Sequence, residues 1–219
     1  MDTFSITSED ERIVYLKKRD NRLSVVIDLI GDIECHIHTD GYAFIVEEIV
    51  GQMLSNKVAD VITERLYNLC GGTISVESVS SLAVEDLRGI GLSKAKSEYI
   101  LCFNNAIKNG ELDLSALEGL PDEEVMRQMM KVRGIGSWTS KMYLLFVLRR
   151  ENVIPYEDGA FMAAYKWMYN TKKLSPEDVK KRCKRWSPYI STGARYLYRA
   201  LDAGLTKKPF KDYLMNREE

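Results

Sequence analysis

The sequence has few of the residues from which metal centres and disulfide frameworks are built. Its 219 residues include four widely spaced cysteines and two histidines. No Cys-x-x-Cys pair occurs, so neither a zinc knuckle nor a four-cysteine iron–sulfur loop can form. His36 and His38 are two residues apart, which prevents them from sharing one helix face, and no third ligand is near. We therefore expect free thiols in a reducing compartment, with no zinc and no iron–sulfur cluster.

Long apolar runs and a strong net charge are also missing. No apolar stretch approaches the ~20 residues of a membrane span, and the acidic N-terminus lacks the apolar core of a signal peptide. We expect a monomeric cytoplasmic protein, nucleoid-associated if bacterial, that does not enter a membrane. The net charge is only −1, yet residues 127–211 hold 19 basic and 6 acidic residues. This uneven distribution is typical of a protein with one DNA-binding face.

Two glycines at positions 134 and 136 mark the most informative stretch. A predicted helix leads into the turn 132–136 (Val-Arg-Gly-Ile-Gly), and a second helix is predicted at 137–149. Gly134 and Gly136 allow the backbone angles that a turn between two close helices requires. They also leave N–H groups accessible at the start of the second helix, where the helix dipole favours an anion. The stretch is therefore predicted to bind a phosphate, and Asp158 follows 22 residues after Gly136.

A Gly-x-Gly pair alone is weak evidence for a phosphate site, because it more often forms a helix-capping turn. The sequence contains a second such pair within residues 87–96 (Leu-Arg-Gly-Ile-Gly-Leu-Ser-Lys-Ala-Lys). No aspartate follows this turn at the distance that separates Asp158 from Gly136. We therefore expect the turn at 87–96 to support the helical core, with a phosphate contact as the alternative.

The rest of the chain is predicted to be helical, apart from a strand signal near 33–38. Residues 8–30 have helical apolar spacing, with Ser8 and Glu11 as a predicted capping box. Residues 42–69 are predicted to form two helices that break before position 54. From the residues alone, this break is interpreted as an ordinary two-helix corner with Met53 in the core.

Three stretches together resemble the helix-hairpin-helix (HhH-GPD) superfamily of DNA glycosylases, and within it the 3-methyladenine DNA glycosylase II type. They are residues 51–55 (Gly-Gln-Met-Leu-Ser), 132–139 (Val-Arg-Gly-Ile-Gly-Ser-Trp-Thr) and 153–158 (Val-Ile-Pro-Tyr-Glu-Asp). The sequence departs from the family at Arg133, where a proline is usual. The resemblance covers nearly the whole chain.

The resemblance implies an all-α fold of two helical domains with the active site in the cleft between them. Residues 41–150 would form the domain that contains the hairpin. Residues 1–40 and 151–219 would form the second domain from both ends of the chain. The implied partner is double-stranded DNA that contains damaged bases.

Individual residues receive roles from the same resemblance. Asp158 would be the catalytic residue, and Met53 the apolar wedge that fills the gap left by a flipped base. The residues implied in DNA binding are Gln52, Met53, Gly134, Gly136, Thr139 and Lys141. The implied base pocket consists of Trp138, Tyr143 and Tyr198, with core packing as the alternative for Trp138 and Tyr143. No cofactor is required, although the main-chain carbonyls of Met130, Val132 and Ile135 resemble a site for Na⁺ or K⁺.

A single carboxylate suffices for a glycosylase that removes cationic alkylated purines. Asp158 would stabilise the positive charge that develops on the sugar, and cationic alkylated purines leave without a general acid. Lyase members have a lysine two residues after the second hairpin glycine, where this chain has Trp138. Lys141 lies three residues further along the predicted helix, nearly one turn on. We therefore predict a monofunctional glycosylase for 3-methyladenine-type lesions. The alternatives are specificity for oxidised or deaminated bases, or a DNA-binding module without catalysis.

Overall fold

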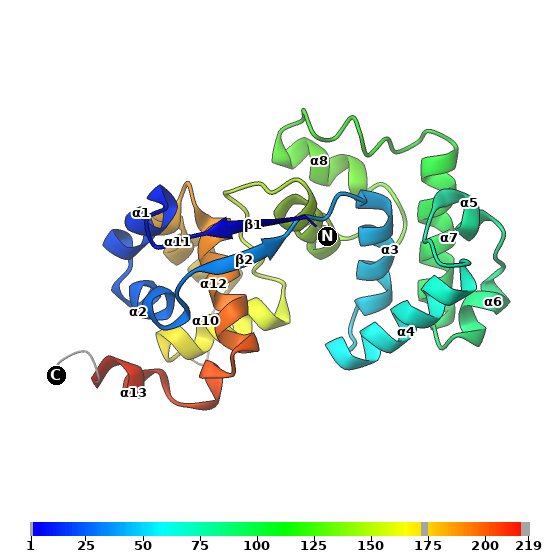
Figure 1. Cartoon of the computed structure of the whole chain (residues 1–219). Coiled ribbons are helices and arrows are strands. Elements are labelled where there is room, and N and C mark those ends of the chain that lie inside the picture. Colours follow the sequence, from blue (N-terminus) through cyan, green and yellow to red (C-terminus); the bar gives the residue numbers. More distant parts are fainter. Residues whose placement is uncertain (1, 172–174, 216–219) are drawn as a thin grey trace. The chain divides into compact units, whose positions relative to one another are not determined.

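The computed structural model describes residues 2–171 and 175–215, most of which lie in helices (Figure 1). The chain divides into two compact units. We call residues 38–148 the hairpin unit, and residues 1–37 together with 149–219 the terminal unit. The predicted all-α class is confirmed, with a two-stranded sheet as a small addition.

The hairpin unit is built from helices that are joined by short turns. They are α3 (Gly41–Gly51), α4 (Asn56–Leu69), α5 (Val76–Ser80), α6 (Val84–Gly89), α7 (Lys94–Lys108), α8 (Asp122–Met129), α9 (Ser137–Met142) and the π-helical segment η1 (Tyr143–Val147). The long helix α7 packs against α3, α5 and α6 (Figure 1). Tyr42 of α3 stacks on Phe103 of α7 with ring centroids 5.2 Å apart, and its hydroxyl donates to Asn104 at 2.7 Å. The predicted break between α3 and α4 is confirmed.

The terminal unit combines elements from both ends of the chain. They are β1 (Thr3–Ile6), α1 (Glu11–Arg19), α2 (Asn21–Ile30), β2 (Ile33–His36), α10 (Gly159–Tyr169), α11 (Pro176–Cys183), the 3-10 turn η2 (Lys184–Trp186), α12 (Ile190–Asp202), the 3-10 turn η3 (Leu205–Lys207) and α13 (Phe210–Met215). α12 packs against α10 and α2, and the large side chains of Trp186, Tyr165 and Tyr196 are fully buried there. Each such burial contributes about 1.5–3 kcal/mol, which holds the two ends of the chain in one core.

The single helix predicted for 8–30 is wrong, because Asp20 divides it. Asp20 has extended backbone angles, and its carboxylate accepts the N–H groups of Arg22 and Leu23 at the start of α2. It also accepts the indole N–H of Trp186 at 3.0 Å, so the buried carboxylate is well satisfied. The predicted cap is wrong as well: Asp10, not Ser8, caps α1.

The two strands pair in antiparallel register, with Thr3 opposite His36 and Ile6 opposite Ile33. The strand signal near 33–38 corresponds to β2, whereas its partner β1 was not predicted. Both strands have four residues, which is too short for a clear alternating pattern. Within residues 2–171 and 175–215, no helix has the length and apolar character needed to cross a membrane.

Candidate active site

The two glycines of the α8–α9 hairpin differ in whether the fold requires a residue without a side chain. Gly134 has a φ of +98°, and a Cβ placed there would lie 2.3 Å from Cβ of Tyr99 on α7. Gly136 has a φ of −104°, which any residue adopts, and a Cβ there would meet no described atom within 4 Å. Gly134 is therefore required by the fold, whereas Gly136 leaves an open approach to the start of α9.

Arg133 occupies the position where the family usually has proline, and it faces outward. Its guanidinium forms an ion pair with Glu98 of α7 at 3.0 Å and lies 5.7 Å from the ring centroid of Tyr99. The turn thus contacts α7 on two sides, through Gly134 and Arg133. Neither Glu98 nor Tyr99 was predicted, because the sequence near position 98 gives no sign of a contact so distant along the chain.

The interior of the turn is apolar, and its carbonyl groups are the candidate cation ligands. Val132 and Ile135 are buried, and the Ile135 N–H donates to the Val132 oxygen at 3.1 Å. Met130 follows the last residue of α8. Neutral carbonyl oxygens suit a hard cation, so this donor set fits the Na⁺ or K⁺ site that the resemblance implied.

Met53, between α3 and α4, is fully exposed at 101% and has a φ of +58°. This excludes the alternative in which Met53 packs in a two-helix corner. The preceding residue, Gln52, is half-buried, and its side-chain Nε2 donates to the Gly134 oxygen at 3.2 Å and to Oγ1 of Thr139 at 3.4 Å. The two segments with the clearest resemblance to the family are therefore in direct contact.

Three of the residues implied in DNA binding or in the base pocket are buried. Thr139 is 1%, Tyr143 2% and Lys141 8% exposed. The Tyr143 ring packs on Gly41, where a Cβ would lie 3.0 Å from the ring, and burial raises the pKa of Tyr143 to about 12. For Tyr143, the structure favours core packing, one of the two roles that the sequence left open. Trp138 is half-buried in the first turn of α9.

Asp158 is the N-cap of α10, and its Oδ1 accepts the N–H of Phe161 at 2.7 Å. Its loop is attached to the start of α12, because the Val153 N–H donates to Oγ of Ser191 at 3.1 Å and the Ser191 N–H donates to the Glu151 oxygen at 3.0 Å. The carboxylate is thus held at the positive end of a helix dipole, on a loop with fixed ends. The capping role was not predicted, although an aspartate directly before a helix is a usual N-cap signal.

Tyr198 of α12 lies beside Phe161, with ring centroids 6.4 Å apart. Phe161 therefore connects Tyr198 to Asp158 within the terminal unit. Trp138 belongs to the hairpin unit. A common pocket of Trp138 and Tyr198 next to Asp158 stays a prediction.

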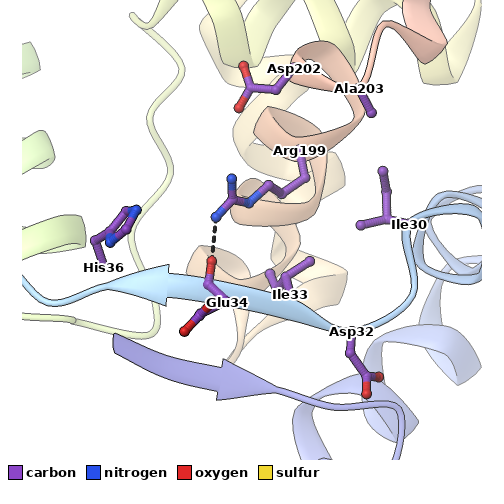
Figure 2. Close-up of a pocket in the computed structure, with 8 residues that line it drawn as sticks. All are labelled: Ile30, Asp32, Ile33, Glu34, His36, Arg199, Asp202 and Ala203. Carbon is purple, nitrogen blue, oxygen red and sulfur yellow. Dashed lines mark hydrogen bonds between the residues drawn. The ribbon is translucent and has the colours of Figure 1, made fainter. Parts of the chain in front are cut away.

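A pocket of about 540 Å³ in the terminal unit has a different character (Figure 2). Its lining consists of Ile30, Asp32, Ile33, Glu34, His36, Arg199, Asp202 and Ala203, and contains none of the predicted site residues. Arg199 reaches across to the main-chain oxygen of Glu34 on β2 (Figure 2). The pocket is open and mixed in charge, and we assign it no part in the chemistry.

The α8–α9 hairpin, the carboxylate at the start of α10 and the mostly helical fold agree with a match to one protein family. The chain belongs to the HhH-GPD superfamily of base excision DNA repair proteins, whose family model matches residues 46–188. The predicted family is thereby confirmed.

Among individual relatives, the Bacillus subtilis protein YfjP is 32% identical over 162 residues, which are 70% of this chain and 56% of that protein. DNA-3-methyladenine glycosylase 1 of Schizosaccharomyces pombe is 23% identical over 213 residues, which are 94% of this chain and 93% of that protein. The crystal structure of DNA-3-methyladenine glycosidase from Bacillus halodurans superposes with a TM-score of 0.82 at 28% identity. That match covers 99% of this chain and 100% of the other.

Proposed function

We propose that this protein is a monofunctional glycosylase of base excision repair that removes alkylated purines of the 3-methyladenine type from duplex DNA. The observation that carries the proposal is the position of Asp158, at the N-terminus of α10 and within the residues that match the superfamily. Relatives named DNA-3-methyladenine glycosylase support the choice of substrate. The reaction would take place in the cytoplasm, or at the nucleoid if the protein is bacterial.

The proposed chemistry is hydrolysis of the bond between the base and C1′ of the sugar. The base leaves as a neutral molecule with the electron pair of the broken C–N bond, water supplies the hydroxyl group that C1′ gains, and the second proton of that water is released to solvent. The negative charge of Asp158 stabilises the cationic sugar that develops on the way. An alkylated purine is cationic before it leaves, so the chain needs no second acidic group. The base must first be flipped out of the duplex to reach the carboxylate.

The α8–α9 hairpin would bind the DNA backbone through N–H groups near Gly136, and a monovalent cation at the carbonyls of Met130, Val132 and Ile135 would add positive charge there. Exposed Met53 would fill the gap in the base stack. Trp138 and Tyr198 would contact the flipped base, since a cationic base is attracted to aromatic faces by about 1–2 kcal/mol.

A panel of lesions under single-turnover conditions tests the proposal. Duplexes that contain 3-methyladenine, 7-methylguanine, 8-oxoguanine, hypoxanthine or uracil are incubated with excess protein, and the released base is measured. We expect release of the methylated purines. Release of only an oxidised or deaminated base would change the substrate class, and binding of every duplex without release would indicate a non-catalytic DNA-binding module.

Borohydride trapping tests the monofunctional character. Lyase chemistry needs an amine that forms a Schiff base with the sugar, and an indole such as that of Trp138 cannot form one. We expect no trapped protein–DNA complex, and strand breaks only after alkali treatment. A trapped complex that disappears in Lys141→Ala would move the protein to the lyase branch of the superfamily.

A further inference from the structure

Gln52 connects two segments that lie 82 residues apart in the sequence. Its Nε2 donates to the main-chain oxygen of Gly134 and to Oγ1 of Thr139, and both acceptors belong to the α8–α9 hairpin. Gln52 directly precedes Met53. These hydrogen bonds therefore hold the residue before the exposed Met53 against the proposed phosphate-binding turn. Both segments belong to the same compact unit.

A second hairpin, formed by α6, the turn around Gly91 and α7, also contacts the C-terminal end of α3. Lys96 is the third residue of α7, and its Nζ donates to the main-chain oxygen of Val50 at 2.7 Å. Thr139 is likewise the third residue of α9. The C-terminal end of α3 is thus held by corresponding positions of two hairpins, through Val50 on one side and Gln52 on the other.

The conformation of Met53 depends on such support. A left-handed backbone is unfavourable for a non-glycine residue and persists only where the surroundings of that residue enforce it. The Met53 side chain is fully exposed, so its own packing cannot enforce the conformation. The neighbouring Gln52 side chain supplies bonds from this turn to the hairpin.

We infer that Gln52 is a positioning residue, which fixes Met53 relative to the phosphate-binding turn before DNA arrives. The inference rests on the proposed function. In a duplex, the distance from a phosphate to the gap left by a flipped base is set by the DNA. A wedge whose backbone is already held at that distance loses less conformational freedom on binding. A direct DNA contact by Gln52, as the resemblance implied, is the competing role.

Substitutions of Thr139 distinguish the two roles of Gln52, because Thr139 is only 1% exposed and cannot itself contact DNA. Thr139→Val keeps the shape but removes one of the two acceptors of Gln52, leaving the Gly134 oxygen in place, and Thr139→Ser restores it. The quantity measured is the ratio of dissociation constants for an intact duplex and the same duplex with a tetrahydrofuran abasic-site analogue. We expect Gln52→Ala to lower this preference about twofold to tenfold, Thr139→Val to lower it by a smaller factor, and Thr139→Ser to restore it. In the Gln52→Ala background, Met53→Ala should have little further effect.

A second measurement needs no DNA. Amide hydrogen exchange of residues 51–55 should be faster in Gln52→Ala and in Thr139→Val than in the wild-type protein. Tyr42→Phe is the matched control, because it removes another buried hydrogen bond of α3, to Asn104, away from this turn. It should lower stability without changing the exchange at 51–55 or the preference for the abasic-site analogue.

The outcomes separate this inference from the proposed function. Unchanged exchange at 51–55 in Gln52→Ala would overturn the inference alone, as would faster exchange with an unchanged preference. A loss of preference in Gln52→Ala that is absent in Thr139→Val and additive with Met53→Ala would assign Gln52 to direct DNA contact. Wild-type protein that binds neither duplex would overturn the proposed function and the inference together.

Discussion

The α6–α7 and α8–α9 hairpins have the same local geometry, but their glycines correspond in an unexpected way. By motif, the pair Gly89 and Gly91 would match the pair Gly134 and Gly136. In the structure, the glycine with positive φ is Gly91 (+109°) in one hairpin and Gly134 (+98°) in the other. The residue that caps the second helix is therefore Ser93 in α6–α7 and Gly136 in α8–α9.

When the two hairpins are aligned on their capping residues, Ser93 and Gly136, other contacts also correspond. Leu92 and Ile135 are the buried aliphatic residues before the caps. Four residues after each cap, a serine hydroxyl donates to the cap's main-chain oxygen, from Ser97 at 3.1 Å and from Ser140 at 2.9 Å. The two turns thus share one geometry.

The difference lies in the cap. Oγ of Ser93 accepts the N–H of Lys96 at 3.3 Å, so the chain itself satisfies part of the start of α7. Gly136 brings no side chain to the start of α9. One hairpin therefore closes its helix with its own side chain, and the other leaves the site open to an external anion. This favours the structural role that the sequence assigned to the turn at 87–96.

The largest expected effect concerns the carboxylate that follows only the α8–α9 hairpin. Asp158→Asn should lower the single-turnover rate of base release by about a hundredfold or more, because the charge that favours the transition state is lost. Asparagine caps helices as well as aspartate does, so the melting temperature and the affinity for an abasic-site analogue should not fall. A near wild-type rate would show that Asp158 is not the catalytic group.

Next in size is the effect of Gly134→Ala on folding. A left-handed alanine costs about 1–2 kcal/mol, and the overlap of its Cβ with Tyr99 adds about 1–3 kcal/mol, so the free energy of unfolding in urea should fall by about 2–5 kcal/mol. Gly91→Ala is the control, since its Cβ would lie 3.6 Å from the nearest atom, Nη1 of Arg65. Equal losses in both variants would contradict the special packing of Gly134 on α7.

Gly136→Ala should change binding rather than stability. Its backbone angles suit alanine, so unfolding should be unaffected or gain about 0.4–1 kcal/mol. The added methyl group blocks the approach of a phosphate to N–H groups, and one such charged hydrogen bond is worth about 1.5–3 kcal/mol. We expect binding to be weaker by about tenfold to a hundredfold, equally for lesioned and intact duplexes because backbone contacts contain no sequence information. Unchanged affinity in a binding assay would remove this turn from the DNA interface.

The smallest effect is expected for Ser93→Ala in the α6–α7 hairpin. Loss of an N-cap side chain lowers stability by about 1 kcal/mol, which thermal unfolding can detect. DNA affinity should remain at the wild-type value. A loss of affinity as large as that of Gly136→Ala would give the α6–α7 hairpin a phosphate contact, which is the alternative that the sequence left open.

Local pattern accounts for much of what could be predicted. Short stretches of sequence were enough to predict the break between α3 and α4 and the hairpin glycines. They also gave the spacing from Gly136 to Asp158. Helical spacing, caps and turns depend on residues within a few positions of one another. The sequence by itself therefore determined the all-helical class, the family and the residues that its motifs mark.

Contacts between distant segments were decided only by the tertiary structure. Tyr99 makes Gly134 obligatory, Gln52 joins the Met53 turn to the hairpin, and Trp186 satisfies the buried carboxylate at which α1 and α2 divide. Each of these contacts depends on how helices pack, and the local sequence around either partner is compatible with other neighbours. For the same reason, the sequence could not tell which glycine of each Gly-x-Gly pair makes the turn, because that register is set by the packing of each turn on helices distant in the sequence.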